Sequence, residues 1–142
     1  ASELYRTTHG VHSAALCDAR DILVFAEDIG RHNAVDKVLG RCLLEGISVS
    51  DRILVTSGRI SSEILFKTAG SGIPVLISKS APTDMGVDLA RELGITLIGF
   101  VRGGGMNVYA GEERIDIPRR EPSVVIEESA AARDDVNSKE ED

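Results

Sequence analysis

The sequence lacks the features that mark several classes of protein. No run of apolar residues approaches the roughly 18 that a membrane-spanning helix needs, so we expect no membrane partner. Only two cysteines, Cys17 and Cys42, are present, too few for a disulfide framework and too far apart for a metal knuckle. We therefore expect a cytoplasmic protein that holds no zinc or other metal.

Cations are also scarce relative to acids. The 16 Lys and Arg residues against 23 Asp and Glu residues give a formal net charge of −7, which argues against a nucleic-acid-binding surface. The imbalance is greatest over residues 119–142, which hold 8 acidic and 4 basic residues and few large apolar ones. We expect one domain over residues 1–118 followed by an acidic, disordered tail over residues 119–142.

What the sequence does contain is an alternation of strand-like and helix-like segments. Strands are expected at residues 12–17, 22–26, 53–56, 74–78 and 95–101, and shorter β-like pieces at 107–110 and 114–117. Helical periodicity begins after Asn33, which is placed to cap it, at Ile60 and at Thr83. The first helical stripe contains Val35, Val38, Leu39, Cys42 and Leu43. This order predicts an α/β fold with an N-terminal hairpin and a mostly parallel sheet that has helices on both faces.

One cation follows the carboxyl end of each of four expected strands, those that end at residues 26, 56, 78 and 101. In an open α/β sheet, ligands bind beyond the carboxyl ends of the strands, where helix N-termini also point. Several hydroxyls and glycines accompany the cations, so we expect an anionic ligand, a phosphate or diphosphate. The residues concerned are Arg31, His32, Ser57, Arg59, Ser61, Lys79, Ser80, Arg102, Gly103, Gly104 and Gly105.

Some of these positions also have a purely structural interpretation. Asp28 and Asp36 are more simply explained as a helix-capping acid and a partner for Arg31 or Lys37. His12 sits in an apolar strand, where a core histidine is common, whereas His32 on a polar loop is the better candidate for ligand contact or proton transfer. The three consecutive glycines are equally consistent with a flexible turn.

Five stretches in order along the chain resemble the C-terminal domain of the FdhD family, the formate dehydrogenase accessory sulfurtransferases. They are THGVHSAAL, EDIGRHNAVDKVLG, TSGRISSEI, SKSAPTDMGVDLA and ITLIGFVRGGGMNVY, and together they run from residue 8 to residue 109. The resemblance implies a cytidine-deaminase-like three-layer sandwich. It also implies a role in taking sulfur from a cysteine desulfurase and passing it to the molybdenum cofactor before that cofactor enters formate dehydrogenase.

The same resemblance identifies the expected anion as a bis(molybdopterin guanine dinucleotide), with GDP as a partial mimic, and implies a homodimer. By the family pattern, residues 100–105 are a cofactor-binding stretch. No catalytic residue is expected. The complete set of expected cofactor-binding residues is Phe100, Val101, Arg102, Gly103, Gly104, Gly105, Arg31, His32, Asn33, Ser57, Arg59, Ser61, Lys79, Ser80 and His12.

The chain departs from the family pattern in two places. His9 stands where the family usually has a glycine, which alters a turn at most. The sulfur-carrying CxxC motif, which lies upstream in the family, does not occur in this sequence. Cys17 and Cys42 occupy apolar positions of a strand and a helix, so we expect both to be inert core residues whose thiol pKa is raised. We therefore expect a cofactor-binding domain that is inactive alone as a sulfurtransferase, either as a fragment or as a stand-alone form.

Two other functions compete with this one. A zinc nucleoside deaminase, suggested by the implied fold, would need a CxxC pair for the metal, and the sequence has none. A guanine-nucleotide-binding or scaffold domain without catalysis remains the alternative.

Overall fold

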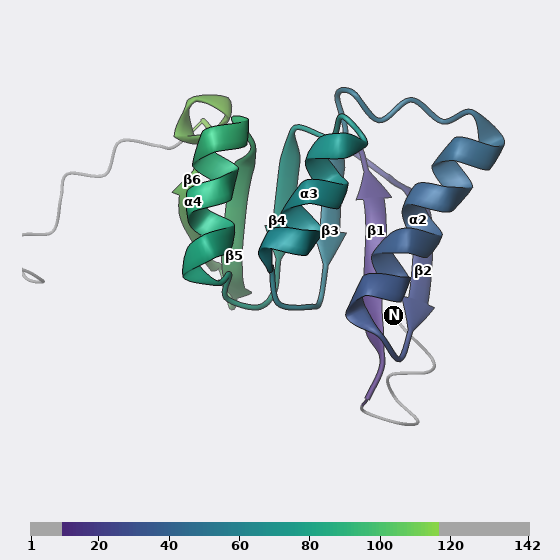
Figure 1. Ribbon diagram of the computed structural model, residues 1–142, viewed down its shortest axis with the longest axis horizontal. Helices are drawn as coiled ribbons and strands as arrows, with labels where there is room; N and C mark the ends of the chain where they lie inside the picture. Colours follow the sequence, from purple (N-terminus) through teal and green to yellow (C-terminus); the bar gives the residue numbers. More distant parts are fainter. Residues whose placement is uncertain (1–9, 117–142) are drawn as a thin grey trace, which may run out of the picture.

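The computed structural model describes residues 10–116, which form one mixed sheet and three α-helices (Figure 1). The expectations for His9 and for the tail at 119–142 lie outside the described residues. The strands are β1 (His12–Cys17), β2 (Ile22–Asp28), β3 (Ile53–Thr56), β4 (Val75–Ser78), β5 (Thr96–Arg102) and β6 (Gly105–Ala110). The helices are α2 (Arg31–Glu45), α3 (Ser62–Gly70) and α4 (Asp84–Leu93), and a 3-10 turn, η1 (Glu112–Arg114), follows β6.

The sheet has six strands in the order β2-β1-β3-β4-β5-β6. Strands β3, β4 and β5 are parallel neighbours, whereas β1 is antiparallel to both β2 and β3, and β6 is antiparallel to β5. The expected α/β class, the N-terminal hairpin and the order of elements are confirmed. The sheet is mixed rather than mostly parallel, since three of its five neighbouring pairs are antiparallel.

All three helices lie on the same face of the sheet (Figure 1), so the expected second helical layer is not found within residues 10–116. The reason is the handedness of the crossovers. The connections from β2 to β3, from β3 to β4 and from β4 to β5 all advance in the same direction across the sheet. Because such connections are right-handed, each one places its helix on the same side.

Local sequence explains where the helices begin and end. Ser61 and Thr83 cap α3 and α4, accepting backbone N–H bonds from Ile64 at 3.5 Å and Gly86 at 3.0 Å. The cap of α2 is Gly30 and not Asn33, which lies inside the first turn. A final correction concerns residues 114–117, where the described residues form no strand: Arg114 ends η1, residues 115 and 116 are irregular, and residue 117 lies outside the described residues.

The core lies between the sheet and the helices. Leu16, Leu54, Leu76 and Leu97, from four neighbouring strands, are completely buried there, and each such side chain contributes about 1.5–3 kcal/mol by leaving water. Leu43, expected on the buried stripe of α2, is 85% exposed, because eight residues of helix rotate it away from the face that Val35 defines. No helix among the described residues is long and apolar enough to cross a membrane.

Candidate functional site: the polar edge of the sheet

The carboxyl ends of β2, β3, β4 and β5 lie at one edge of the sheet, as the sequence predicts. Strand β1 runs the other way, so it begins at this edge: His12 is paired with Asp28, and Ala14 with Thr56. His12 is therefore brought beside the loop that follows β3. It is half-buried at the sheet edge and does not lie in the apolar core.

A cavity of about 300 Å³ opens at this edge, and we call it the edge cavity. It is lined by Gly10, Val11, His12, Ser57, Lys79, Ser80 and Arg102. Five residues of the predicted binding set are thus brought together from four separate segments of the chain. Gly10 and Val11 were not in that set, because nothing in the sequence showed that β1 begins at the carboxyl ends of its neighbours.

Serine side chains hold the loops around the edge cavity. The Ser57 hydroxyl accepts the Ser13 backbone N–H at 2.9 Å, and its oxygen lies 3.4 Å from His12 Nδ1. The Ser80 hydroxyl donates to the Ser57 carbonyl at 2.9 Å, and the Ser78 hydroxyl donates to the Gly58 carbonyl at 2.6 Å. These bonds tie the loop after β3 to the loop after β4. Ser57 and Lys79 are therefore held side by side by hydroxyl groups and not by ion pairs.

Arg31 lies against the same loop. A Cβ atom added at Gly58 would stand 2.7 Å from Arg31 Cβ, so the arginine stem passes over a position that only glycine leaves open. The Arg31 Nε is buried and has no hydrogen-bond partner within residues 10–116. A buried donor without a partner costs about 1–3 kcal/mol, and an anionic ligand at this edge would satisfy it.

Asp28 and Lys37 hold the turn that presents Arg31. Asp28 accepts bonds from the Gly30 backbone N–H at 2.9 Å and from Asn33 Nδ2 at 3.2 Å, and it pairs with Lys37 Nζ at 2.8 Å. The Lys37 side chain, followed by these two donors, lowers the pKa of the Asp28 carboxyl to about 2. The structural interpretation of Asp28 is therefore confirmed, and Asn33 acts here as its partner.

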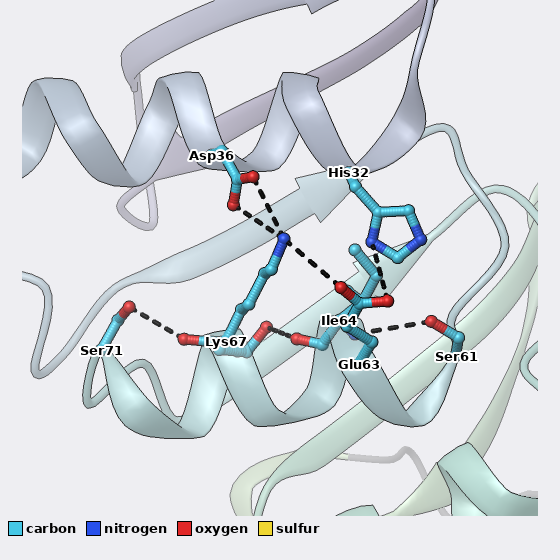
Figure 2. A network of polar contacts seen from close by, with 8 residues as sticks. His32, Asp36, Ser61, Glu63, Ile64, Lys67 and Ser71 are labelled. Atoms are coloured by element: carbon cyan, nitrogen blue, oxygen red, sulfur yellow. Dashed lines mark hydrogen bonds and ion pairs between the residues drawn. The ribbon is translucent and has the colours of Figure 1, made fainter.

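His32 and Ser61 are directed toward α3 and away from the edge cavity. Figure 2 shows His32 pointing at Glu63, with 3.9 Å between Nδ1 and Oε2, next to a cluster in which Lys67 pairs with Asp36 at 3.0 Å. Ser61 is occupied in capping α3, and Arg59 is exposed beside it. The structure therefore groups neither His32 nor Ser61 with the residues that line the edge cavity.

The segment at residues 100–105 forms the end of the β5–β6 hairpin. Gly103 and Gly104 have φ angles of 48° and 89°, as a tight two-residue turn requires, and Arg102 is paired with Gly105 across it. Phe100 also adopts a positive φ, 57°, at an irregularity of β5, and the Arg102 guanidinium lies 4.3 Å from the centre of its ring. The glycines thus make the turn, and Arg102 is the member of this stretch that lines the edge cavity.

The cations of this edge differ from those elsewhere in their ion pairing. Within residues 10–116, five cations have an acidic partner within 4.0 Å, namely Lys37, Arg41, Arg52, Lys67 and Arg114. Six have none, and four of these six are the strand-end cations Arg31, Arg59, Lys79 and Arg102. The edge therefore concentrates uncompensated positive charge in a chain that is negative overall.

The uncovered face of the sheet holds a second, apolar cavity of about 420 Å³. Ala15, Cys17, Phe25, Val55 and Ile77 are among its lining residues, and it shares Ser57 and Lys79 with the edge cavity. Val101, predicted to bind the cofactor, lines this apolar cavity instead of the edge cavity. The apolar run at residues 22–26 predicted a strand, but not that one of its sides would be left uncovered by the described helices.

The two cysteines lie on opposite sides of the sheet. Cys42, a residue of α2, is buried in the core, as expected. Cys17 is only partly buried and lines the apolar cavity, so its assignment to the core was wrong. Burial raises the pKa of both thiols, assisted by Asp18 near Cys17 and by Glu45 near Cys42. Among residues 10–116, no three His, Cys, Asp or Glu side chains are grouped as a metal site would require.

Comparison with known proteins agrees with these features. A sequence profile described as the FdhD/NarQ family matches residues 1–116. The chain belongs to this family. It is 56% identical over 114 residues to the sulfur carrier protein FdhD of Bacillus subtilis (strain 168), an alignment that covers 80% of this chain and 44% of that protein. It is 53% identical over 115 residues to the protein of the same name from Staphylococcus aureus (strain MRSA252), covering 81% and 43%.

A solved structure shows the same fold. The crystal structure of a formate dehydrogenase accessory protein from Desulfotalea psychrophila superimposes with a TM-score of 0.76 at 41% identity, covering 81% of this chain and 52% of that one. The resemblance first indicated by EDIGRHNAVDK is therefore confirmed. The chain spans less than half the length of the curated FdhD relatives that it matches.

Proposed function

We propose that this chain is the ligand-binding part of an accessory sulfur carrier for formate dehydrogenase, and that its polar sheet edge binds the phosphate groups of a molybdopterin guanine dinucleotide. One observation carries the proposal: Lys79 and Arg102, two cations without an acidic partner among the described residues, line one cavity together with the hydroxyl groups of Ser57 and Ser80. Charge-assisted hydrogen bonds to phosphate are the interaction that such an arrangement favours.

The roles of the residues follow from their positions. Lys79 and Arg102 line the cavity and would contact phosphate oxygens directly, while Ser57 and Ser80 would contribute hydroxyl groups. Arg31 packs against Gly58, in the loop that contributes Ser57 to the cavity, and its buried Nε, which has no partner within residues 10–116, is a further candidate donor. His12 would complete the lining opposite Lys79.

In this proposal, none of the described residues carries the sulfur. A persulfide carrier needs an accessible thiolate of lowered pKa, and the pKa of both thiols is raised. In this proposal a cysteine desulfurase supplies the sulfur and formate dehydrogenase receives the finished cofactor, with the chain acting as a homodimer. The absence of a reactive thiol among the described residues also favours the second candidate, a guanine-nucleotide-binding or scaffold domain without catalysis.

Titration calorimetry of the full 142-residue chain with GDP and with guanosine tests the ligand class. We expect heat of binding for GDP and a much weaker response for guanosine, because the edge residues recognise phosphate and not base. Equal heats for the two ligands, or none for either, would contradict the proposal. Titration with the molybdopterin guanine dinucleotide itself separates the two candidates, because the first requires the chain to bind that cofactor, whereas the second requires only a guanine nucleotide or a partner protein.

A further inference from the structure

A groove on the helical face exposes large apolar side chains. It lies between α3 and α4, which are neighbours in Figure 1, and has a volume of about 330 Å³. It is lined by Ser62, Phe66, Met85, Asp88, Leu89 and Glu92. Phe66 is 61% exposed and Met85 71% exposed, although side chains of this size are usually covered.

The charged residues of the groove are all acidic. Asp84, Asp88 and Glu92 follow one another at intervals of four along α4, which aligns them on one side of the helix. None of the three forms an ion pair within residues 10–116. The neighbouring α2–α3 contact is different, because there the acids Asp36 and Glu63 both lie against Lys67 (Figure 2).

We propose that the α3–α4 groove is a docking site for a basic amphipathic helix of a partner protein. An aromatic ring and a flexible thioether side by side form the kind of floor that accepts the apolar face of a helix. The uncompensated carboxylates of Asp88 and Glu92 on the rim select lysines or arginines beside that face. α4 has ten residues and so offers about 15 Å of groove, which accommodates roughly three turns of a partner helix.

Other partners fit this surface less well. An anionic membrane surface or a nucleic acid would meet the acidic stripe of α4 with charge of the same sign. A second copy of the chain would need a basic apolar helix to place in the groove. The described helices do not offer one, since α2 has Arg41 paired with Glu45 next to its exposed leucines and α3 has Lys67 paired with Asp36.

The test uses a labelled peptide of about 15 residues with leucines on one helical face and lysines on the other, long enough to be helical when bound. Its binding to the full chain is followed by fluorescence anisotropy. We expect saturable binding that weakens as salt is added. The Phe66→Ser variant should lose affinity by about tenfold or more, as for the loss of an aromatic anchor. The double variant Asp88→Lys with Glu92→Lys should lose at least as much, because like charges would then oppose each other.

Two matched variants make the test specific. Leu43→Ser removes another exposed apolar side chain of the helical layer, 85% exposed at the end of α2, and Asp21→Lys reverses an exposed acid in the turn between β1 and β2. Both should bind the peptide like the unmodified chain. The proposal is overturned if these controls lose as much affinity as the groove variants, if the unmodified chain does not bind, or if a peptide with glutamates in place of lysines binds equally well. Sedimentation showing a dimer that Phe66→Ser dissociates would also overturn it, by assigning the groove to a second copy.

Discussion

The cations of the sheet edge and those of the helical layer have opposite surroundings. In the helical layer, Lys37 and Lys67 each lie within about 3 Å of a carboxylate, which fixes a turn in one case and joins α2 to α3 in the other. At the edge, Lys79 and Arg102 face a cavity and have no acidic partner among the described residues. The same side-chain chemistry is used for structure in one region and left available for a ligand in the other.

Because of this difference, the loops at the sheet edge must be held together by groups other than its cations. Backbone groups there are satisfied by serine and threonine hydroxyls, as in the bond from Ser80 to the Ser57 carbonyl and that from the Gly58 N–H to Thr56 Oγ1 at 3.2 Å. The loops after β3 and β4 therefore keep their shape without a salt bridge among the described residues, whereas the turn before α2 is held by Asp28 and Lys37. Edge cations are accordingly expected to affect binding and not stability, and helical-layer cations the reverse.

The largest expected effect is on ligand affinity at the edge. Under the proposed function, Arg102→Ala would remove one charge-assisted hydrogen bond to phosphate, worth about 1.5–3 kcal/mol, so GDP should bind about 10- to 100-fold more weakly. Arg91→Ala is the matched control, since Arg91 is also exposed and has no ion pair within residues 10–116, but lies within α4. Calorimetry that finds the two variants alike would remove the distinction between the edge and the rest of the surface.

A change in packing should disturb the edge next most strongly. Gly58→Ala places a methyl group 2.7 Å from Arg31 Cβ, and overpacking of this kind costs about 1–3 kcal/mol of unfolding free energy. Gly40→Ala in α2 is the control, because nothing lies within 4 Å of the added carbon, and it should stabilise the chain by about 0.5–1 kcal/mol. Urea unfolding measures both, and a neutral Gly58→Ala would show that Arg31 is free to move.

A smaller effect separates two lysines. Lys67→Ala breaks the pair with Asp36 and should lower the free energy of unfolding by no more than about 1 kcal/mol, since the pair is partly exposed. Lys79→Ala should leave the unfolding free energy unchanged and weaken GDP binding. Thermal melts and calorimetry on both variants test this. The prediction is wrong if Lys67→Ala weakens GDP binding and Lys79→Ala lowers the unfolding free energy.

Asp28 provides a dependence on pH. Its pKa is lowered to about 2 in the folded chain, so the stability that it contributes is complete above its unfolded pKa and is lost as the pH falls through the range from about 4 to about 2. The difference in unfolding free energy between the unmodified chain and Asp28→Asn should shrink over that range. Urea titrations at several pH values measure it, and a difference that stays constant would show that Lys37 does not bind the carboxylate selectively.

The last prediction is that the chain accepts no sulfur. Incubated with a cysteine desulfurase and its substrate, the chain should gain no sulfur on Cys17 or Cys42, because a raised pKa keeps both thiols protonated. Mass spectrometry gives the result directly. One added sulfur atom, removed by the serine variant of either cysteine, would make that residue a carrier.

Much of this molecule was accessible from sequence patterns alone. Two short apolar runs on either side of a polar turn located β1 and β2, glycines at 46 and 94 ended two helices, and the sequence EDIGRHNAVDK indicated the family. The expectation that cations after the strands meet at one edge followed from the α/β class. These features depend on near neighbours in the chain, whose effects are the same wherever the segment is placed.

Other features depended on strand order, which no local pattern encodes. The antiparallel placement of β1 brought His12 to the edge cavity, and the one-directional crossovers put every described helix on a single face. His32 and Arg102 both follow strands, but their surroundings differ. His32 lies against Glu63 of α3, whereas Arg102 lines the edge cavity. The sequence by itself thus determined which segments are strands and helices and which residues stand at their ends. Only the tertiary structure decided which of those residues meet, because contacts between distant segments are set by packing and handedness and not by spacing along the chain.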